Sequence, residues 1–328
     1  MKQTMQALQM KGLNTLVKAE VPVPVPGAGE VLVQTRAATI CTSDLHDLKS
    51  NPFGIAYPRI LGHEAAGIVV AAGSDVKHLP PGTRVAVHPV VHCGKCEECK
   101  RGFRHLCANM EHLGYNRDGS FAEYFTQRAD RVIAVPDNIP DAAAALLEPV
   151  AVCLQAVARA GDLKDRSVLI AGDGPFGNII ARLVKRAGAA RVIITGRVPF
   201  RLQSIPGVEI PDTDPTNCVD VAILAVSSAE ALDTCVKALR PRGRLVVFSA
   251  LKEPVKLNLF TLHLSELEIA GACNDEDRME EALKCLGDKD LKLGELITHQ
   301  VPFENWESAF TLARDGHDRA LKVAITFS

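Results

Sequence analysis

The chain has 328 residues, of which 47% are hydrophobic and 23% are charged, and its formal net charge is −2. This length exceeds the size at which a single hydrophobic core stops growing, so we expect two domains. The slightly acidic balance gives no electrostatic footprint for a nucleic acid or an anionic membrane. Residues 1–14 lack the apolar core of a secretory signal, and no stretch approaches a membrane span in length. We therefore expect a cytoplasmic protein.

The sequence of residues 1–149 is typical of a mainly-β domain. Short runs of strand-forming composition alternate with Gly and Pro clusters. The clearest predicted strands are 31–39, 66–72, 84–87, 121–126 and 131–135. The proline-rich segment 21–30 cannot donate a full ladder of hydrogen bonds, so we expect it at a sheet edge or in an extended connection.

Four cysteines of this half lie within fifteen residues: Cys93, Cys96, Cys99 and Cys107. Spacings of two to four residues let successive thiolates bind one ion, and four thiolates complete a tetrahedral zinc site without an open position. We expect a structural zinc here, because the surrounding segment 91–110 holds little that could form a core. Two disulfides are the alternative, and the tight clustering without an export signal disfavours them.

From residue 150 the pattern changes to alternating strands and helices, which predicts a parallel sheet covered on both faces. The predicted strands are 167–171, 191–195, 219–225, 244–249 and 268–272. We place this domain at 150–274, followed by a C-terminal segment, 275–328, that begins with an amphipathic helix at 278–286. After Arg201 the chain is too short for a normal helix, strand and helix before the strand at 219.

A glycine-rich turn joins the first of these strands to a helix. It contains Gly172, Gly174, Pro175, Phe176 and Gly177. Between a strand and a helix, this GxGxxG pattern predicts a dinucleotide site, because the glycines let a pyrophosphate approach the positive helix N-terminus.

The next predicted strand ends where such folds usually carry an acid for the ribose hydroxyls. Here that position is Gly196, followed by Arg197 and then Arg201, with no carboxylate before Glu209. The missing carboxylate removes repulsion of a 2′-phosphate, which a guanidinium can bind with two hydrogen bonds. We therefore predict NADP(H) in preference to NAD(H). The alternative is that both arginines merely face solvent.

Cys41, His63 and Glu148 form a second candidate metal site from three separate loops. One cysteine, one histidine and one carboxylate leave a zinc ion with an open position, which is the catalytic arrangement. Taken singly, each residue also fits a structural role in a core or at a helix N-terminus. Their occurrence together with the four cysteines and the dinucleotide motif favours a catalytic zinc.

Over essentially its full length the sequence resembles the zinc-dependent medium-chain alcohol dehydrogenase family, including its polyol dehydrogenases. The motifs that carry this resemblance are Cys41–His46, Gly62–Glu64, the four-cysteine segment, Leu147–Pro149 and Gly172–Gly177. The resemblance implies an α/β protein in which a GroES-like, mainly-β catalytic domain is interrupted by a Rossmann domain. It also implies reversible oxidation of an alcohol by NAD(P)⁺, two zinc ions per chain and commonly a dimer or tetramer.

The family pattern assigns roles to individual residues. Cys41 and His63 become zinc ligands, with Glu148 as the third ligand either directly or through water. Glu64 can replace a water on the metal in such members. Asp44 would hydrogen-bond the far nitrogen of His63 and fix its tautomer.

The resemblance also implies a proton relay and a substrate class. Ser43 and His46 match the family's route from the alkoxide through the nicotinamide ribose to solvent. We expect a secondary alcohol or polyol as substrate, with threonine or an aldose as alternatives, and a nonenzymatic NADPH-binding redox sensor as a further one. The candidate pocket aromatics are Phe53, Tyr57, Tyr115 and Phe121, each of which could equally belong to a core.

Overall fold

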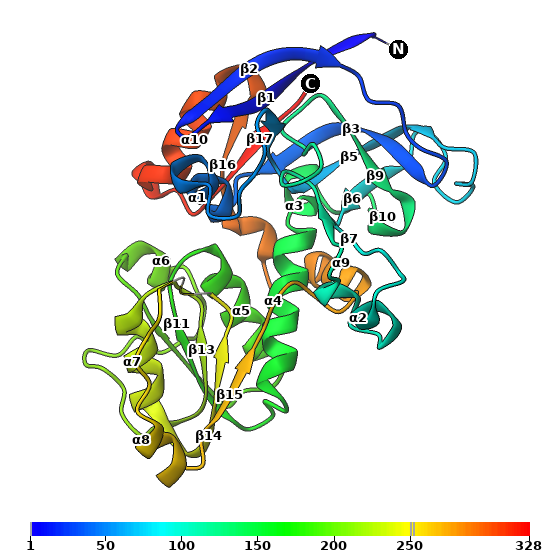
Figure 1. Cartoon of the computed structure of the whole chain (residues 1–328). Coiled ribbons are helices and arrows are strands. Elements are labelled where there is room, and N and C mark those ends of the chain that lie inside the picture. The colour runs from blue at the N-terminus through cyan, green and yellow to red at the C-terminus, as the bar shows by residue number, and fades with distance from the viewer. Residues whose placement is uncertain (1, 250, 252) are drawn as a thin grey trace. The chain divides into compact units, whose positions relative to one another are not determined.

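The computed structural model describes residues 2–249, 251 and 253–328. The chain divides into two compact units, Met1–Pro149 with Met279–Ser328, and Val150–Arg278 (Figure 1). The second unit is therefore an insertion, and the last fifty residues return to the first unit.

A seven-stranded mixed sheet forms the centre of the first unit. Its strands, in spatial order, are β10 (Val132–Ala134), β6 (Arg84–Val87), β5 (Glu64–Ala72), β3 (Glu30–Thr39), β17 (Lys322–Thr326) and β16 (Ile297–Pro302), and β9 (Tyr124–Arg128) pairs with β3 outside this order. The pair β16–β17 is parallel, whereas β17 runs antiparallel to β3. All five strands predicted in residues 1–149 are confirmed, although β9 begins at Tyr124 rather than at 121.

An N-terminal hairpin that the sequence does not predict forms a second sheet in this unit. β1 (Thr4–Gly12) pairs with β2 (Thr15–Pro22) and with β4 (Arg59–Ile60). The proline-rich segment belongs to β2 only as far as Pro22, and the chain then continues to β3 without a strand. Because β2 is an end strand of this sheet, the expected position at a sheet edge is confirmed for Val21 and Pro22.

The helices of the first unit are short, and the core fills the space between them and the sheets. They are α1 (Thr42–Ser50), α2 (Glu97–Lys100), η1 (Arg104–Leu106), η2 (Ala129–Arg131), α3 (Asp141–Ala144), α9 (Met279–Gly287), η3 (Leu293–Leu296), η4 (Phe303–Asn305), α10 (Trp306–Asp315) and η5 (His317–Arg319). A two-stranded sheet of β7 (Val90–Val91) and β8 (Glu111–His112) flanks the four-cysteine segment. The core joins Val33 of β3, Val69 of β5 and Ile325 of β17 to Phe121 and Phe310.

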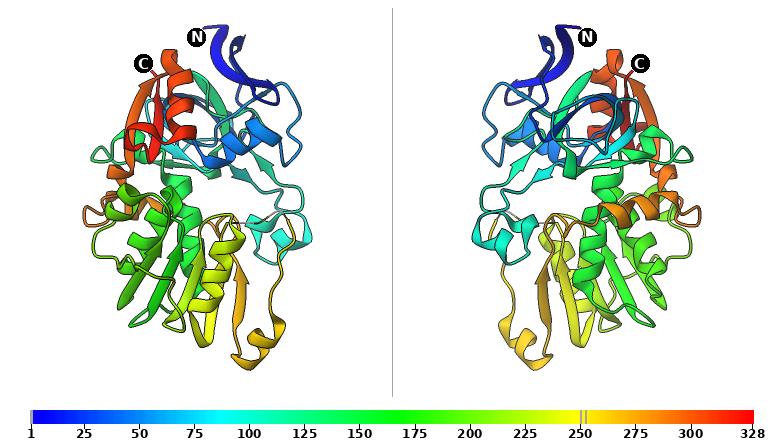
Figure 2. Two further views of the ribbon diagram at one scale, coloured as in Figure 1. Left: turned by 90° about the vertical axis from the view of Figure 1, so that its left-hand side faces the viewer. Right: turned by 90° about the vertical axis from the view of Figure 1, so that its right-hand side faces the viewer.

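The second unit has a five-stranded, fully parallel sheet. Its order is β12 (Arg191–Thr195), β11 (Ser167–Ala171), β13 (Val219–Leu224), β14 (Leu239–Val247) and β15 (Glu268–Gly271). Helix α5 (Pro175–Arg186) connects β11 to β12, and α7 (Ala229–Ala238) connects β13 to β14 (Figure 2). These connections run in opposite directions along the sheet, so right-handed crossovers place the two helices on opposite faces. This confirms the predicted doubly wound architecture.

The predicted shortening after the second strand of this unit is also confirmed. α6 (Pro199–Gln203) has only five residues. A single bridge between Ile193 and Glu209 stands where a doubly wound sheet normally has a further strand. The adenosine end of the expected cofactor site is thus built from fewer residues than usual.

One segment corrects the expectation about membrane spans. Asp141–Ala160, which comprises α3 and α4 (Leu147–Ala160), is long and apolar enough to cross a membrane by length and composition. However, 83% of its most apolar window is buried inside the protein. That burial is typical of a core helix.

Candidate functional site

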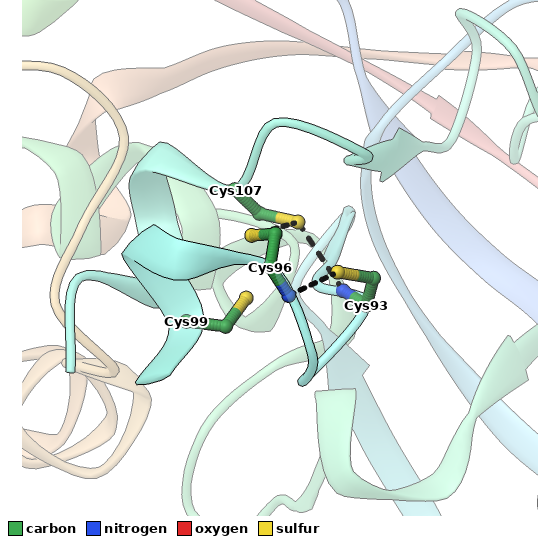
Figure 3. Close-up of side chains that lie close together, drawn as sticks. All are labelled: Cys93, Cys96, Cys99 and Cys107. Carbon is green, nitrogen blue, oxygen red and sulfur yellow. Dashed lines mark hydrogen bonds between the residues drawn. The ribbon is translucent and has the colours of Figure 1, made fainter. Parts of the chain in front are cut away.

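The four clustered cysteines converge in the structure. The sulfur atoms of Cys93, Cys96, Cys99 and Cys107 all lie within 4.8 Å of one another, and Figure 3 shows them surrounding one small region. Two of the four, Cys93 and Cys96, precede the single turn of α2, which carries Cys99. Every one of the ten cysteines has a free thiol, which removes the disulfide alternative.

Backbone amides already favour thiolates in this cluster. The N–H groups of Lys95 and Cys96 lower the pKa of Cys93 to about 6. The N–H groups of Cys93 and Asn109 each donate to Sγ of Cys107 over 3.3 Å. Burial raises the pKa of Cys99 to about 12, and a bound cation would offset that cost. The donor set and its separation fit a tetrahedral zinc.

A second group brings together Cys41, His63 and Glu64, whose ligand atoms also lie within 4.8 Å of one another. All three are buried and come from two places in the chain: the residue before α1, and the start of β5. The preceding Gly62 has φ = 95°, and a Cβ at that position would lie 2.8 Å from the backbone nitrogen of Phe121. Glycine therefore allows the tight turn that delivers His63 and Glu64.

Asp44 connects the cysteine and the histidine of this group. One of its carboxylate oxygens lies 3.4 Å from Nδ1 of His63, and the other accepts the backbone N–H of Cys41 over 2.8 Å. Burial alone would lower the pKa of His63, but the Asp44 carboxylate and the Cys41 side chain raise it well above its usual value. The opposite ring nitrogen, Nε2, lies 3.5 Å from Oγ of Ser43. Nε2 is thus the nitrogen on the side of Ser43 and available to a metal.

Glu64 has a buried partner that sequence analysis missed. Nζ of Lys322 lies 2.8 and 2.6 Å from the two carboxylate oxygens, and Thr39 donates a short hydrogen bond to one of them. Burial opposes the charge of Lys322, but the negative charges of Glu64 and Cys41 raise its pKa. The sequence feature that could have indicated this partner is the lysine at the start of β17, since the rest of that strand is mostly apolar.

Glu148 lies outside the three-residue group but near it. It is buried in the first turn of α4, and its charge contributes to raising the pKa of Lys322. Ser43 and His46 are three residues apart on α1 and therefore lie on one side of that helix, with His46 exposed. The structure thus brings most of the expected catalytic residues into one neighbourhood of the first unit.

Of the four candidate pocket aromatics, Phe121 belongs to the core, whereas Phe53 and Tyr57 are exposed. Phe121 is fully buried and packs edge-to-face on Phe310, so its place is in the core. Phe53 packs edge-to-face on Tyr115, and Tyr57 is 41% exposed.

His112 is a further residue that sequence analysis missed. Its ring lies 5.5 Å from the ring of His63 and 6.1 Å from that of Tyr115. Burial lowers the pKa of His112 to about 3, so its ring is neutral. Nδ1 lies 2.6 Å from the carbonyl oxygen of Leu113, an acceptor, so the proton resides on Nδ1 and Nε2 offers a lone pair. No spacing rule connects His112 to His63, since they meet only in the folded chain.

In the second unit the glycine-rich turn has the geometry that a dinucleotide site requires. Gly172 has φ = 128°. A Cβ at Gly177 would lie 1.9 Å from the carbonyl oxygen of Gly172, so only glycine fits at this helix–strand contact. Helix α5 then begins with Gly174 as N-cap and Pro175 in its first turn, leaving backbone N–H groups for an anion.

The residues after β12 have partners within the protein. The guanidinium of Arg197 lies 2.6 Å from the carboxylate of Glu230 at the protein surface. Arg201, in α6, lies over the ring of Phe200 at 5.7 Å. The carboxylate of Asp173 accepts the backbone N–H groups of Arg197 and Val198.

Comparison with known proteins identifies related families and relatives. Residues 27–137 match the family model of the alcohol dehydrogenase GroES-like domain, and residues 213–288 match that of the zinc-binding dehydrogenases. L-threonine 3-dehydrogenase of Pyrococcus furiosus is 34% identical over 319 residues, which cover 90% of this chain and 91% of that protein. Sorbitol dehydrogenase of Bacillus subtilis is 30% identical over 343 residues, which cover 98% of this chain and 97% of that protein.

Solved structures agree in fold over nearly the whole chain. A Sinorhizobium meliloti 1021 protein bound to NADP has a TM-score of 0.91 and 26% identity, covering 99% of this chain and 100% of that one. The rspB protein of Escherichia coli CFT073, complexed with NADH, has a TM-score of 0.93, 27% identity and the same coverage. This chain therefore belongs to the zinc-dependent medium-chain alcohol dehydrogenase family and is an oxidoreductase with a GroES-like and a Rossmann-type domain.

Proposed function

We propose that the protein transfers a hydride between NADP(H) and a secondary alcohol or polyol at a zinc site in its first unit. The observation that carries this proposal is the buried group of Cys41, His63 and Glu64, with Ser43 beside the same histidine. Zinc bound there would polarise the substrate oxygen and lower the pKa of the alcohol. The catalytic domain, residues 1–149 with 275–328, would supply this site. The Rossmann domain, residues 150–274, would bind the cofactor.

Cys41, His63 and Glu148 are the proposed ligands, with Glu148 acting directly or through water. Lys322 compensates the charge of Glu64, so a thiolate from Cys41 and a carboxylate from Glu148 would balance Zn²⁺. In this arrangement Glu64 would remain bound to Lys322 and Thr39, and its closeness to Cys41 and His63 would let it approach a bound metal. Asp44 holds Nδ1 of His63, so Nε2 would be the nitrogen that binds the ion.

The chain's own residues supply the proton route. Ser43, with its hydroxyl near Nε2 of His63, is placed to accept the proton that the alcohol loses. His46 lies on the same side of α1 and is exposed, so it can pass that proton to solvent. The four-cysteine cluster would hold the second, structural zinc, which gives two zinc ions per chain.

The substrate class is supported by the relatives and by the polar surroundings of the site. The two relatives above are named for threonine and sorbitol, which both carry a second polar group beside the reacting carbon. The neutral His112 near His63 offers an acceptor for such a group. A threonine- or aldose-type enzyme is the second candidate. A redox sensor is less well supported, because it needs neither the Asp44–His63 contact nor Ser43.

For the cofactor, the absence of an acid at Gly196 and the presence of Arg197 and Arg201 support NADP(H) over NAD(H). The pyrophosphate would lie on the turn of Gly172, Gly174, Pro175, Phe176 and Gly177. Arg197 would have to exchange Glu230 for the 2′-phosphate, which costs little because both side chains are more than four-fifths exposed.

We also propose a cytoplasmic homo-oligomer. The ten free thiols suit a reducing compartment. β15 is the end strand of the parallel sheet, and α8 (Leu259–Leu264), which precedes it, exposes apolar side chains. Leu259, Phe260 and Leu264 are each 65% exposed or more. An open strand edge beside such residues favours association with a second copy.

The test is cofactor reduction by the zinc-loaded protein with secondary alcohols, polyols, aldoses and threonine, using NADP⁺ and NAD⁺ in parallel. We expect turnover with a polyol or secondary alcohol, faster with NADP⁺, and about two zinc ions per chain by elemental analysis. A preference for NAD⁺ would contradict the cofactor proposal. No turnover with only one bound zinc would support the sensor.

A further inference from the structure

Asp173, the second residue of the glycine-rich turn, reaches across to the end of the neighbouring strand β12. One oxygen of its carboxylate, Oδ2, accepts the backbone N–H of Arg197 over 2.8 Å and that of Val198 over 2.6 Å. A Cβ at Gly196 would lie 2.4 Å from Cβ of Asp173 and 2.6 Å from Oδ2. Glycine at 196 and aspartate at 173 therefore fit each other, and the carboxylate fills the space that a side chain at 196 would occupy.

The Asp173 carboxylate lies at the end of β12, the part of a dinucleotide-binding sheet that normally contacts the cofactor. In a dinucleotide-binding sheet, the residue that ends the second strand faces the adenosine ribose. Two adjacent backbone N–H groups at that position are suitable donors for a phosphate. Here both donors are already bonded to a carboxylate. The Asp173 carboxylate therefore places a negative charge at the end of β12, where the adenosine ribose of a bound dinucleotide is expected.

The nearby arginines do not neutralise the repulsion between the Asp173 carboxylate and a 2′-phosphate. The guanidinium of Arg197 points to Glu230, so a second carboxylate stands near the same residue. Arg201 lies beside Phe200 in α6. A cofactor with a 2′-phosphate must displace the Asp173 carboxylate or bind close to it. A cofactor with a free 2′-hydroxyl can instead donate a hydrogen bond to it.

We propose that Asp173 is a specificity residue that weakens binding of a 2′-phosphorylated cofactor relative to one with a free 2′-hydroxyl. Dinucleotide-binding folds usually have an acid at the end of the second strand, and Gly196 stands there in this chain. Asp173 supplies such a carboxylate from the glycine-rich turn. The inference rests on the proposed function, in that the second unit binds NAD(P)(H). It adds that the preference for NADP(H) is small in this chain, because Arg197 and Arg201 act against Asp173.

The experiment compares the full-length protein with Asp173→Asn, whose amide oxygen can still accept a backbone N–H but carries no charge. Binding of 2′,5′-ADP and of 5′-AMP is measured by calorimetry, so the readout does not depend on turnover. We expect the affinity ratio of 2′,5′-ADP to 5′-AMP to rise about tenfold or more, which corresponds to about 1.4 kcal/mol, because one repelling charge at contact distance is removed. Asp173→Ala should shift the ratio in the same direction.

Glu266→Gln is the matched control, because it removes a carboxylate of the same unit at the opposite ends of the strands, before β15. Its ratio should stay within about twofold of the parent, as expected for an exposed charge. An unchanged ratio in folded Asp173→Asn and Asp173→Ala, checked by circular dichroism, would overturn the inference. If the parent binds neither nucleotide, both the inference and the cofactor proposal fail. A shifted ratio in a protein that turns over no alcohol supports the inference and contradicts the proposed function alone.

Discussion

The two candidate metal sites of the first unit are assembled in opposite ways. The four-cysteine cluster comes from one segment of fifteen residues, and its sulfur atoms are close together because of short spacings and a single helical turn. The group of Cys41, His63 and Glu64 instead depends on Asp44, Thr39 and Lys322, and Lys322 lies 258 residues from Glu64 in the sequence. The first site is local, whereas the second exists only in the folded domain.

This difference has a chemical counterpart. Four thiolates leave a zinc ion no open position, so the first site suits a structural role. The second group mixes soft and hard ligands, has a serine beside the histidine, and carries a buried lysine that compensates one carboxylate. A metal there would keep room for a substrate. If the two sites are independent, removing a ligand of one site should leave the metal of the other in place.

The largest effect is expected for His63→Gln, which removes the only imidazole of the second group. Turnover should fall more than about 1,000-fold, because the metal's help in ionising the alcohol is lost. Elemental analysis should show one zinc fewer per chain, with the zinc of the four-cysteine site retained. His317→Gln, at an exposed histidine, is the control and should keep both metals. Full turnover in His63→Gln would place the reaction elsewhere.

Lys322→Met should have the next largest effect, measured as the free energy of unfolding in urea. It leaves the Glu64 carboxylate buried without its cation, and breaking a buried pair in this way costs about 3–5 kcal/mol. The double variant Lys322→Met with Glu64→Gln should be more stable than Lys322→Met alone, since no uncompensated charge remains. Equal stability of the single variant and the parent would show that the pair contributes nothing to the fold.

Much of the fold follows from local sequence patterns. The strands β6, β11 and β12 have the bounds that composition and turn residues predict, because their short apolar runs are bounded by Gly or polar residues. The unpredicted hairpin of β1 and β2 has the sequence TMQALQMKG in its first strand, where Gln and Lys interrupt the apolar pattern. Its pairing is decided by packing against Ile60 and Ala122 rather than by composition.

The candidate site was only partly predictable for a related reason. Cys41 and His63 are residue types that bind zinc, so their motifs indicated them. Lys322, His112 and Asp173 act through contacts with residues far away in the chain, and nothing in their own neighbourhood specifies those partners. Long-range contacts of this kind follow from the assembled sheets, which the strand pattern indicates only in outline.

Ser43→Ala should have a smaller effect that is confined to the catalytic step. Its hydroxyl lies near Nε2 of His63 without being one of the grouped ligands, so both metals should remain. We expect turnover to fall on the order of 100-fold, the usual contribution of a positioned proton-transfer group, while cofactor affinity stays nearly unchanged. Thr42→Ala, at the exposed preceding residue of α1, is the matched control. Unaltered turnover in Ser43→Ala would remove Ser43 from the proton route.

Cys99→Ser is expected to have the smallest effect on turnover, although it should remove the zinc of the four-cysteine site. That zinc would order segment 91–110, so its loss should lower the melting temperature and expose this segment to proteases. Turnover per catalytic zinc should stay within about tenfold of the parent, because a closed four-thiolate site takes no part in the reaction. Cys273→Ser, at an exposed cysteine outside both groups, should retain both metals. If Cys99→Ser lost the second metal as well, the two sites would be coupled, and the local assembly of the first site would not make it independent of the second.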